Sequence, residues 1–154
     1  MNLAFLRLAA LSLSLAAGAS FAADTAPVND KFTPARTKIA EKNWAGAIDE
    51  LKKVNDPASA EWNNLMGYSL RKADPVANAG EAEKFYNEAL RIEPRHRGAL
   101  EYSGELYLMT GNLAKAEERL AALDKACFLP CEEYSDLKKA VARYKAAGNK
   151  YVAQ

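Results

Sequence analysis

The sequence contains few residues of the types that perform catalysis or hold a metal: only two cysteines and one histidine among 154 residues. A zinc site needs four ligands, and His96 lies far along the chain from Cys127 and Cys131, so these three residues do not make one. No glycine-rich phosphate loop, metalloprotease motif or nucleophile motif is present either. We therefore expect that the chain is not an enzyme and has no cofactor.

An excess of charge of either sign is also missing. Residues 1–22 contain a single charged side chain, Arg7, and without it 20 basic side chains balance 20 acidic ones. A nucleic-acid surface needs clustered lysine and arginine, whereas here charges of both signs alternate, as on solvent-exposed helix faces. We expect no binding to nucleic acid.

Long hydrophobic runs are absent after the first residues of the chain. The run from Leu8 to Ala17 follows Arg7 and precedes the small residues Ser20 and Ala22, a pattern typical of a cleavable secretory signal peptide. The run is too short to span a hydrocarbon core of about 30 Å, so we expect no membrane span. We predict a signal peptide at 1–22 and a flexible linker at 23–30, and therefore a periplasmic or secreted protein.

Three segments of the remaining chain repeat one pattern, in which a small residue is followed four positions later by a large one. The three alanines of the pattern, Ala47, Ala82 and Ala116, are 35 and 34 residues apart. Such a period is typical of helical repeat arrays. Because a small residue lets a neighbouring helix approach and a large one fills the groove beside it, the pattern also indicates helix packing.

The upstream halves of the segments share a second pattern. The stretches NLMGYSL (64–70) and YSGELYL (102–108) place Gly67 and Gly104 at equivalent positions. Pro94 ends the second unit, and Gly111 lies at the turn of the third. Together these residues resemble the tetratricopeptide repeat (TPR) of two antiparallel helices. The resemblance implies an all-α, right-handed solenoid of about three TPR-like helix-turn-helix units over residues 31–128.

A further helix is predicted after the third unit, at 129–147, with a tail at 148–154. Tyr134, Leu137, Val141 and Tyr144 recur at intervals of three, four and three residues and form one apolar stripe. Solenoid ends need a unit that covers the last apolar face, so we interpret this segment as a capping helix.

The cysteine pair, Cys127 and Cys131, flanks the turn before the capping helix. In an oxidising compartment, two cysteines without other partners favour one intramolecular disulfide, which would fix the angle of the cap. Alternatives remain: two thiolates can bind Cu(I), the pair can be redox-active, or the thiols can stay free or bond another chain.

His96 lies between Arg95 and Arg97 in the turn after Pro94. Three such side chains near a helix start could hold an anion. We favour the simpler interpretation, an exposed polar turn between two repeats.

The resemblance also implies a binding surface, because in the family the first helices of successive units line a concave groove that binds a protein segment. We expect an exported adaptor or scaffold with a protein or peptide partner; a copper or thiol-redox accessory role for the cysteine pair, and self-assembly into a homo-oligomer, are the alternatives. Carried over by register, the groove positions are Phe32, Arg36 and Ile39 in the first unit, Asn64, Tyr68 and Arg71 in the second, and Glu101, Glu105 and Leu108 in the third.

Overall fold

The computed structural model describes residues 30–152, and within that range the chain is all-α with no strand. The predicted signal peptide at 1–22 and nearly all of the predicted linker lie outside the described residues. The helices, in chain order, are α1 (Thr33–Ala40), α2 (Trp44–Val54), α3 (Ala60–Ala73), α4 (Ala79–Ile92), α5 (Arg97–Met109), α6 (Leu113–Ala126) and α7 (Glu132–Ala146).

Polar side chains and left-handed residues set where these helices begin and end. The side chains of Asn43, Ser59 and Asn112 each accept a hydrogen bond from a backbone N–H in the first turn of α2, α3 and α6. Gly111, between α5 and α6, has a φ of +78°, a conformation that glycine adopts without steric cost. The chain therefore reverses direction sharply between helices.

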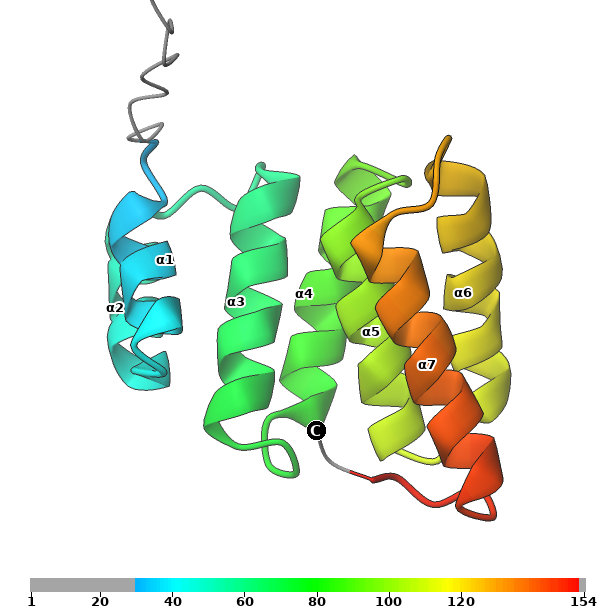
Figure 1. Ribbon diagram of the computed structural model, residues 1–154. Coiled ribbons are helices and arrows are strands. Elements are labelled where there is room, and N and C mark those ends of the chain that lie inside the picture. The colour runs from blue at the N-terminus through cyan, green and yellow to red at the C-terminus, as the bar shows by residue number, and fades with distance from the viewer. Residues whose placement is uncertain (1–29, 153–154) are drawn as a thin grey trace, which may run out of the picture.

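Consecutive helices pack side by side (Figure 1). The pairs α1 with α2, α3 with α4, and α5 with α6 are each joined by a short turn, and α2 contacts α3 as α4 contacts α5. Helix α7 packs on both α5 and α6 at the end of the row. The six helices before α7 match the span predicted for the repeats.

The small-and-large pattern builds the core, as predicted. Ala47, Ala82 and Ala116 are fully buried. Of the large residues four positions later, Leu51 and Tyr86 are fully buried and Leu120 is partly buried. Gly67 lies against Tyr86, close enough that an added Cβ would sit 2.9 Å from the Cε1 atom of the tyrosine ring. The glycine therefore lets α3 and α4 approach closely.

Gly104 serves a different contact. A Cβ at this position would sit 2.5 Å from the Cδ2 atom of Leu137, which lies on α7. The close approach thus joins the third pair of helices to the capping helix, rather than α5 to its own partner α6.

A helix is present where the sequence predicts one at 129–147, and it runs from Glu132 to Ala146 as α7. Leu137, Val141 and Tyr144 of its predicted stripe are buried in one cluster with residues of α5 and α6, and Tyr134 packs against that cluster half-buried. Gly148 follows in the left-handed region. The stripe therefore covers an apolar surface that α5 and α6 would otherwise expose.

Candidate partner groove

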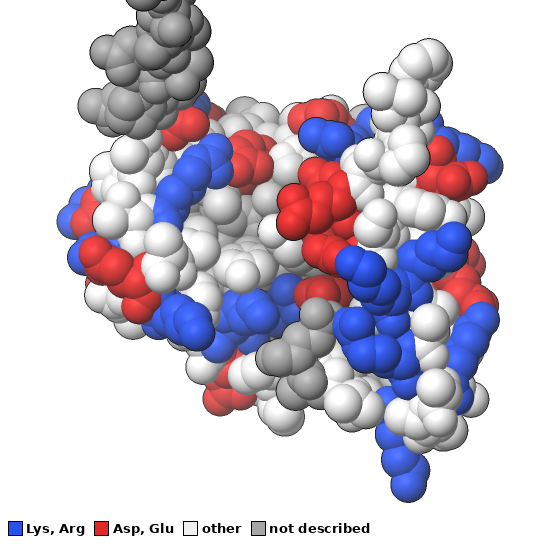
Figure 2. All heavy atoms as spheres, in the orientation of Figure 1, with Lys and Arg blue, Asp and Glu red and all other residues white. Residues whose placement is uncertain are grey.

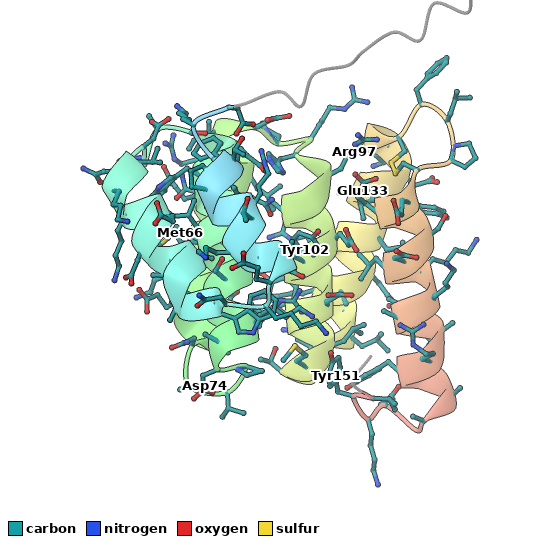
Figure 3. All side chains as sticks on the ribbon, turned by 60° about the vertical axis from the view of Figure 1, so that its left-hand side comes forward. Met66, Asp74, Arg97, Tyr102, Glu133 and Tyr151 are labelled. Carbon is teal, nitrogen blue, oxygen red and sulfur yellow. A yellow bond between two sulfur atoms is a disulfide. The ribbon has the colours of Figure 1, made fainter. Side chains whose placement is uncertain are left out.

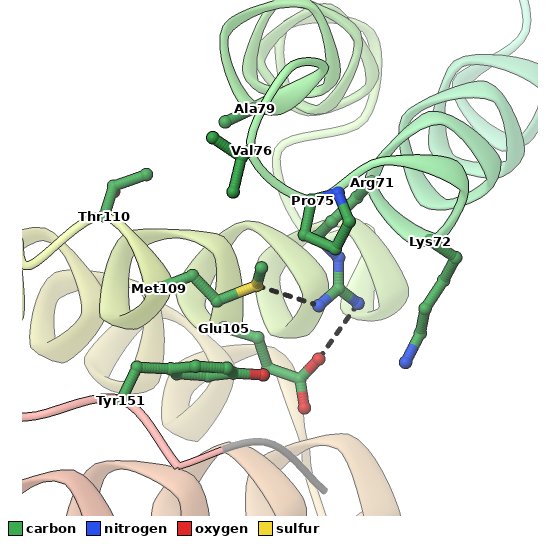
Figure 4. Close-up of a pocket in the computed structure, with 9 residues that line it drawn as sticks. All are labelled: Arg71, Lys72, Pro75, Val76, Ala79, Glu105, Met109, Thr110 and Tyr151. Carbon is green, nitrogen blue, oxygen red and sulfur yellow. Dashed lines mark hydrogen bonds and ion pairs between the residues drawn. The ribbon is translucent and has the colours of Figure 1, made fainter.

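Helices α1, α3, α5 and α7 surround a hollow on one face of the molecule (Figure 2). A cavity of ≈ 540 Å³ lies between the C-terminal ends of α3 and α5, lined also by the turn after α3 and by Tyr151 of the tail (Figure 4). We call the hollow and this cavity the groove. Helices α1, α3 and α5, where the sequence predicted the partner site, are three of the helices that surround it.

The predicted groove residues divide into two groups. Asn64, Tyr68 and Arg71 of α3 and Glu101 and Glu105 of α5 lie together at the groove, through the contacts described below. The other four predicted positions lie elsewhere. Arg36 and Ile39 are on α1, Phe32 immediately precedes α1, and Leu108 of α5 is buried in the core.

Two of those four positions lie in the core. Phe32 and Leu108 are buried in separate apolar clusters, where their side chains pack against other core residues. Ile39 is half-buried against the same cluster as Phe32. Arg36 is the accessible member of the group, and its guanidinium pairs with Glu61 of α3.

Arg71 lines the cavity, and this residue is only 2% exposed. Its Nη2 atom forms an ion pair of 2.9 Å with Oε2 of Glu105, and its Nε donates a 3.4 Å hydrogen bond to the hydroxyl of Tyr86. A longer contact of 3.8 Å joins Nη1 to the sulfur of Met109 (Figure 4). Burial opposes the charge of Arg71, but Tyr86 and Glu105 outweigh it and raise the pKa, so the guanidinium stays ionised.

Three aromatic rings lie along the groove between α2, α3 and α5. The ring of Tyr68 lies 4.7 Å from that of Tyr102 and 6.0 Å from that of Trp44, measured between centroids. The guanidinium of Arg71 lies 5.6 Å and 5.7 Å from the two tyrosine rings. These contacts combine stacking with cation–π attraction, which fixes the rings relative to the arginine.

Glu101 is the unusual member of the set. The residue is 9% exposed, and its carboxylate has no hydrogen bond or ion pair with any described residue. Burial, together with repulsion from Glu105, Asp136 and Glu133, raises the pKa of Glu101 to about 8, against a smaller opposite influence of Arg71. At neutral pH the side chain is therefore mostly protonated.

Sequence reasoning missed several groove residues. Tyr102 neighbours a predicted position and stacks on Tyr68, and the adjacency of the two could have drawn attention to it. Lys72 and Met109 lie at helix ends, one position beyond the register used. Tyr151 reaches the groove because the tail turns back after α7 and passes the C-terminal end of α5 (Figure 1), which no local pattern predicts.

The turn containing His96 also differs from its prediction. His96 is not simply exposed, because its Nδ1 accepts a hydrogen bond from the backbone N–H of Ala99 and so caps α5. Its Nε2 lies 3.0 Å from Oε2 of Glu61, which also pairs with Arg36. The histidine thus links the start of α5 to α3 and α1.

Cys127 and Cys131 form a disulfide, as predicted, and no described cysteine is free. The bond joins the end of α6 to the start of α7, with Phe128 exposed at 98% in the loop between them. A copper or redox role would begin with reduction of this bond, since neither sulfur is a thiolate here. Within residues 30–152, no group of three or more histidine, cysteine, aspartate or glutamate residues is arranged to hold a metal ion.

Comparison with known proteins gives no family: no protein-family model matches the chain, and no curated protein matches it. Among the described helices, none combines the length and the apolar character needed to cross a bilayer. The disulfide is compatible with an oxidising compartment.

The disulfide should stabilise the cap locally. We expect the double substitution Cys127→Ser with Cys131→Ser to lower the free energy of unfolding by about 1 to 3 kcal/mol, because the short loop loses its constraint. Limited proteolysis should then cleave within 127–134, while circular dichroism still reports folded helices. The exposed Leu129→Ser in the same loop is the control and should change stability by less than about 0.5 kcal/mol. Equal cleavage of both variants would contradict a constraining role.

Proposed function

We propose that this chain is an exported adaptor or scaffold that binds a segment of another protein in the groove. The observation that carries the proposal is the groove itself: aromatic, amide and charged side chains from α3 and α5 converge on one hollow, and one of them, Glu101, is unpaired within the described chain. Aromatic and arginine side chains are enriched at the centres of protein interfaces.

The proposal includes the architecture that the sequence resemblance implies, a right-handed solenoid of three TPR-like pairs with α7 as the cap. Sequential packing of short antiparallel helices supports it, because each pair contacts its neighbours in chain order. In such an array the first helices α1, α3 and α5 line one face. A partner segment lying along that face would contact several pairs at once.

Site-specific photo-cross-linking tests the proposal in the cells that produce the protein. A photoreactive amino acid replaces Lys72, which is exposed and lines the cavity, and in a matched variant it replaces Glu118, which is exposed on α6 outside the groove. We expect a discrete adduct with another protein from position 72 and none from position 118.

Two other outcomes would contradict the proposal. Adducts from position 118 alone would place the binding surface elsewhere. An adduct from position 72 at twice the mass of the chain would indicate self-assembly in place of an adaptor.

A further inference from the structure

We infer that the wall of the groove formed by α5 and α7 binds a basic side chain, lysine or arginine, of the partner segment. The inference rests on the proposed function, since it assumes that a protein segment enters the groove. It adds the chemistry by which that segment is recognised.

Four carboxylates make this wall acidic. Glu101 and Glu105 are one turn apart on α5, and Glu133 and Asp136 are nearly one turn apart on α7. Acidic side chains gather beside the hollow in Figure 2, and Figure 3 shows Glu133 between α7 and α5. Each of the other three raises the pKa of Glu101, so all four act on one place.

Two of the cations at this wall are already engaged, and two others, Lys72 and Arg143, line hollows with Glu105 rather than with Glu101. Arg71 pairs with Glu105 at 2.9 Å, and Arg97 lies 3.5 Å from Glu133. Asp136 pairs with Lys139 of its own helix. Glu101 is left as the carboxylate of the wall without a counterion, although it is the most buried of the four.

A second, independent acceptor lies across the groove on α3. Asn64 is 5% exposed, and its Oδ1 has no hydrogen-bond donor, while its Nδ2 donates to Glu61 at 3.3 Å. With Tyr102 and Glu133, Asn64 lines a hollow of ≈ 340 Å³ beside the start of α5. The basic residues of that hollow are each bonded to another group: Arg95 to the carbonyl of Lys125, His96 to Glu61 and Arg97 to Glu133. A buried acceptor without a donor is costly, so an entering donor gains free energy there.

Together these groups favour a cationic donor over other side chains. An acidic side chain would meet carboxylates, and an apolar one would leave Asn64 Oδ1 and Glu101 unsatisfied. A lysine or arginine supplies the charge and the hydrogen-bond donors that these groups lack, and it can lie over the rings of Tyr68 and Tyr102. Its charge would lower the pKa of Glu101 and ionise it, so that binding at neutral pH releases a proton.

Selection from a random peptide library displayed on phage tests the inference on the full chain at pH 7. Wild type is compared with Glu101→Gln, which mimics the protonated acid in shape, and with Glu118→Gln, a matched change on exposed α6. We expect wild type and Glu118→Gln to enrich peptides with lysine or arginine at one fixed position. Glu101→Gln should lose that preference and bind the strongest wild-type peptide at least about tenfold more weakly.

The outcomes separate the inference from the proposed function. Enriched peptides without a basic position would overturn the inference and leave the adaptor function standing. No enrichment with any variant would overturn both.

A second measurement covers the case in which Glu101→Gln does not fold. Calorimetric titration of wild type with the strongest peptide, in two buffers of different ionisation heat, should show release of roughly one proton at pH 7. Equal heats in the two buffers would contradict an ion pair at Glu101.

Discussion

Replacing Arg71 with methionine should lower the free energy of unfolding by about 3 to 5 kcal/mol, because it removes one partner of a buried ion pair. Methionine keeps most of the apolar volume but leaves Glu105 without its cation, beside Glu101. The hydroxyl of Tyr86, fully buried, also loses its hydrogen bond from Arg71 Nε. Urea denaturation followed by circular dichroism measures the change.

The control for this experiment is an exposed ion pair. Arg91 pairs with Glu88 on the surface of α4, and its side chain is 71% exposed. Arg91→Met should unfold at nearly the same urea concentration as wild type, because an exposed ion pair contributes little to stability. If both methionine variants unfold at the same urea concentration, Arg71 does not hold the groove together.

The second large effect is expected at the contact between α5 and α7. Gly104→Ala should destabilise the chain by about 1 to 3 kcal/mol, because the new Cβ would lie 2.5 Å from Cδ2 of Leu137. Leu137 is fully buried in the cluster that joins α5, α6 and α7, so a shift of its side chain disturbs packed neighbours. Thermal unfolding should show a lower melting temperature.

Gly80→Ala is the matched comparison, since a Cβ at Gly80 of α4 meets nothing within 4 Å. Alanine is the better helix former by up to about 1 kcal/mol, so this variant should be as stable as wild type or more so. A Gly104→Ala variant that also gains stability would show that α7 does not pack tightly on α5.

The helices, α7 included, could be predicted from the sequence because they follow from local periodicity. The intervals between Tyr134, Leu137, Val141 and Tyr144 select one face of a helix, and three of the four are buried. Periodicity does not say which neighbour covers a face, and for this reason the contact of Gly104 with α7 was not predicted.

The groove was harder to predict than the helices. Register alone separates inner from outer helix faces only coarsely, so Phe32 and Leu108 were assigned to a groove although both pack in the core. The pairing of Arg71 with Glu105 depends on how α3 and α5 lie next to each other. The sequence pattern of a single helix does not contain that information. Tyr151 reaches the cavity through a turn after α7 whose direction depends on tertiary packing.

The central claim is that a protein segment binds between α3, α5 and α7, and a crystal structure of the chain with the strongest peptide from the selection tests it most directly. We expect peptide density in the groove, with contacts to Tyr68 and Tyr102 and a basic side chain at Glu101. Density on the outer face, against α4 or α6, with an empty groove would contradict it.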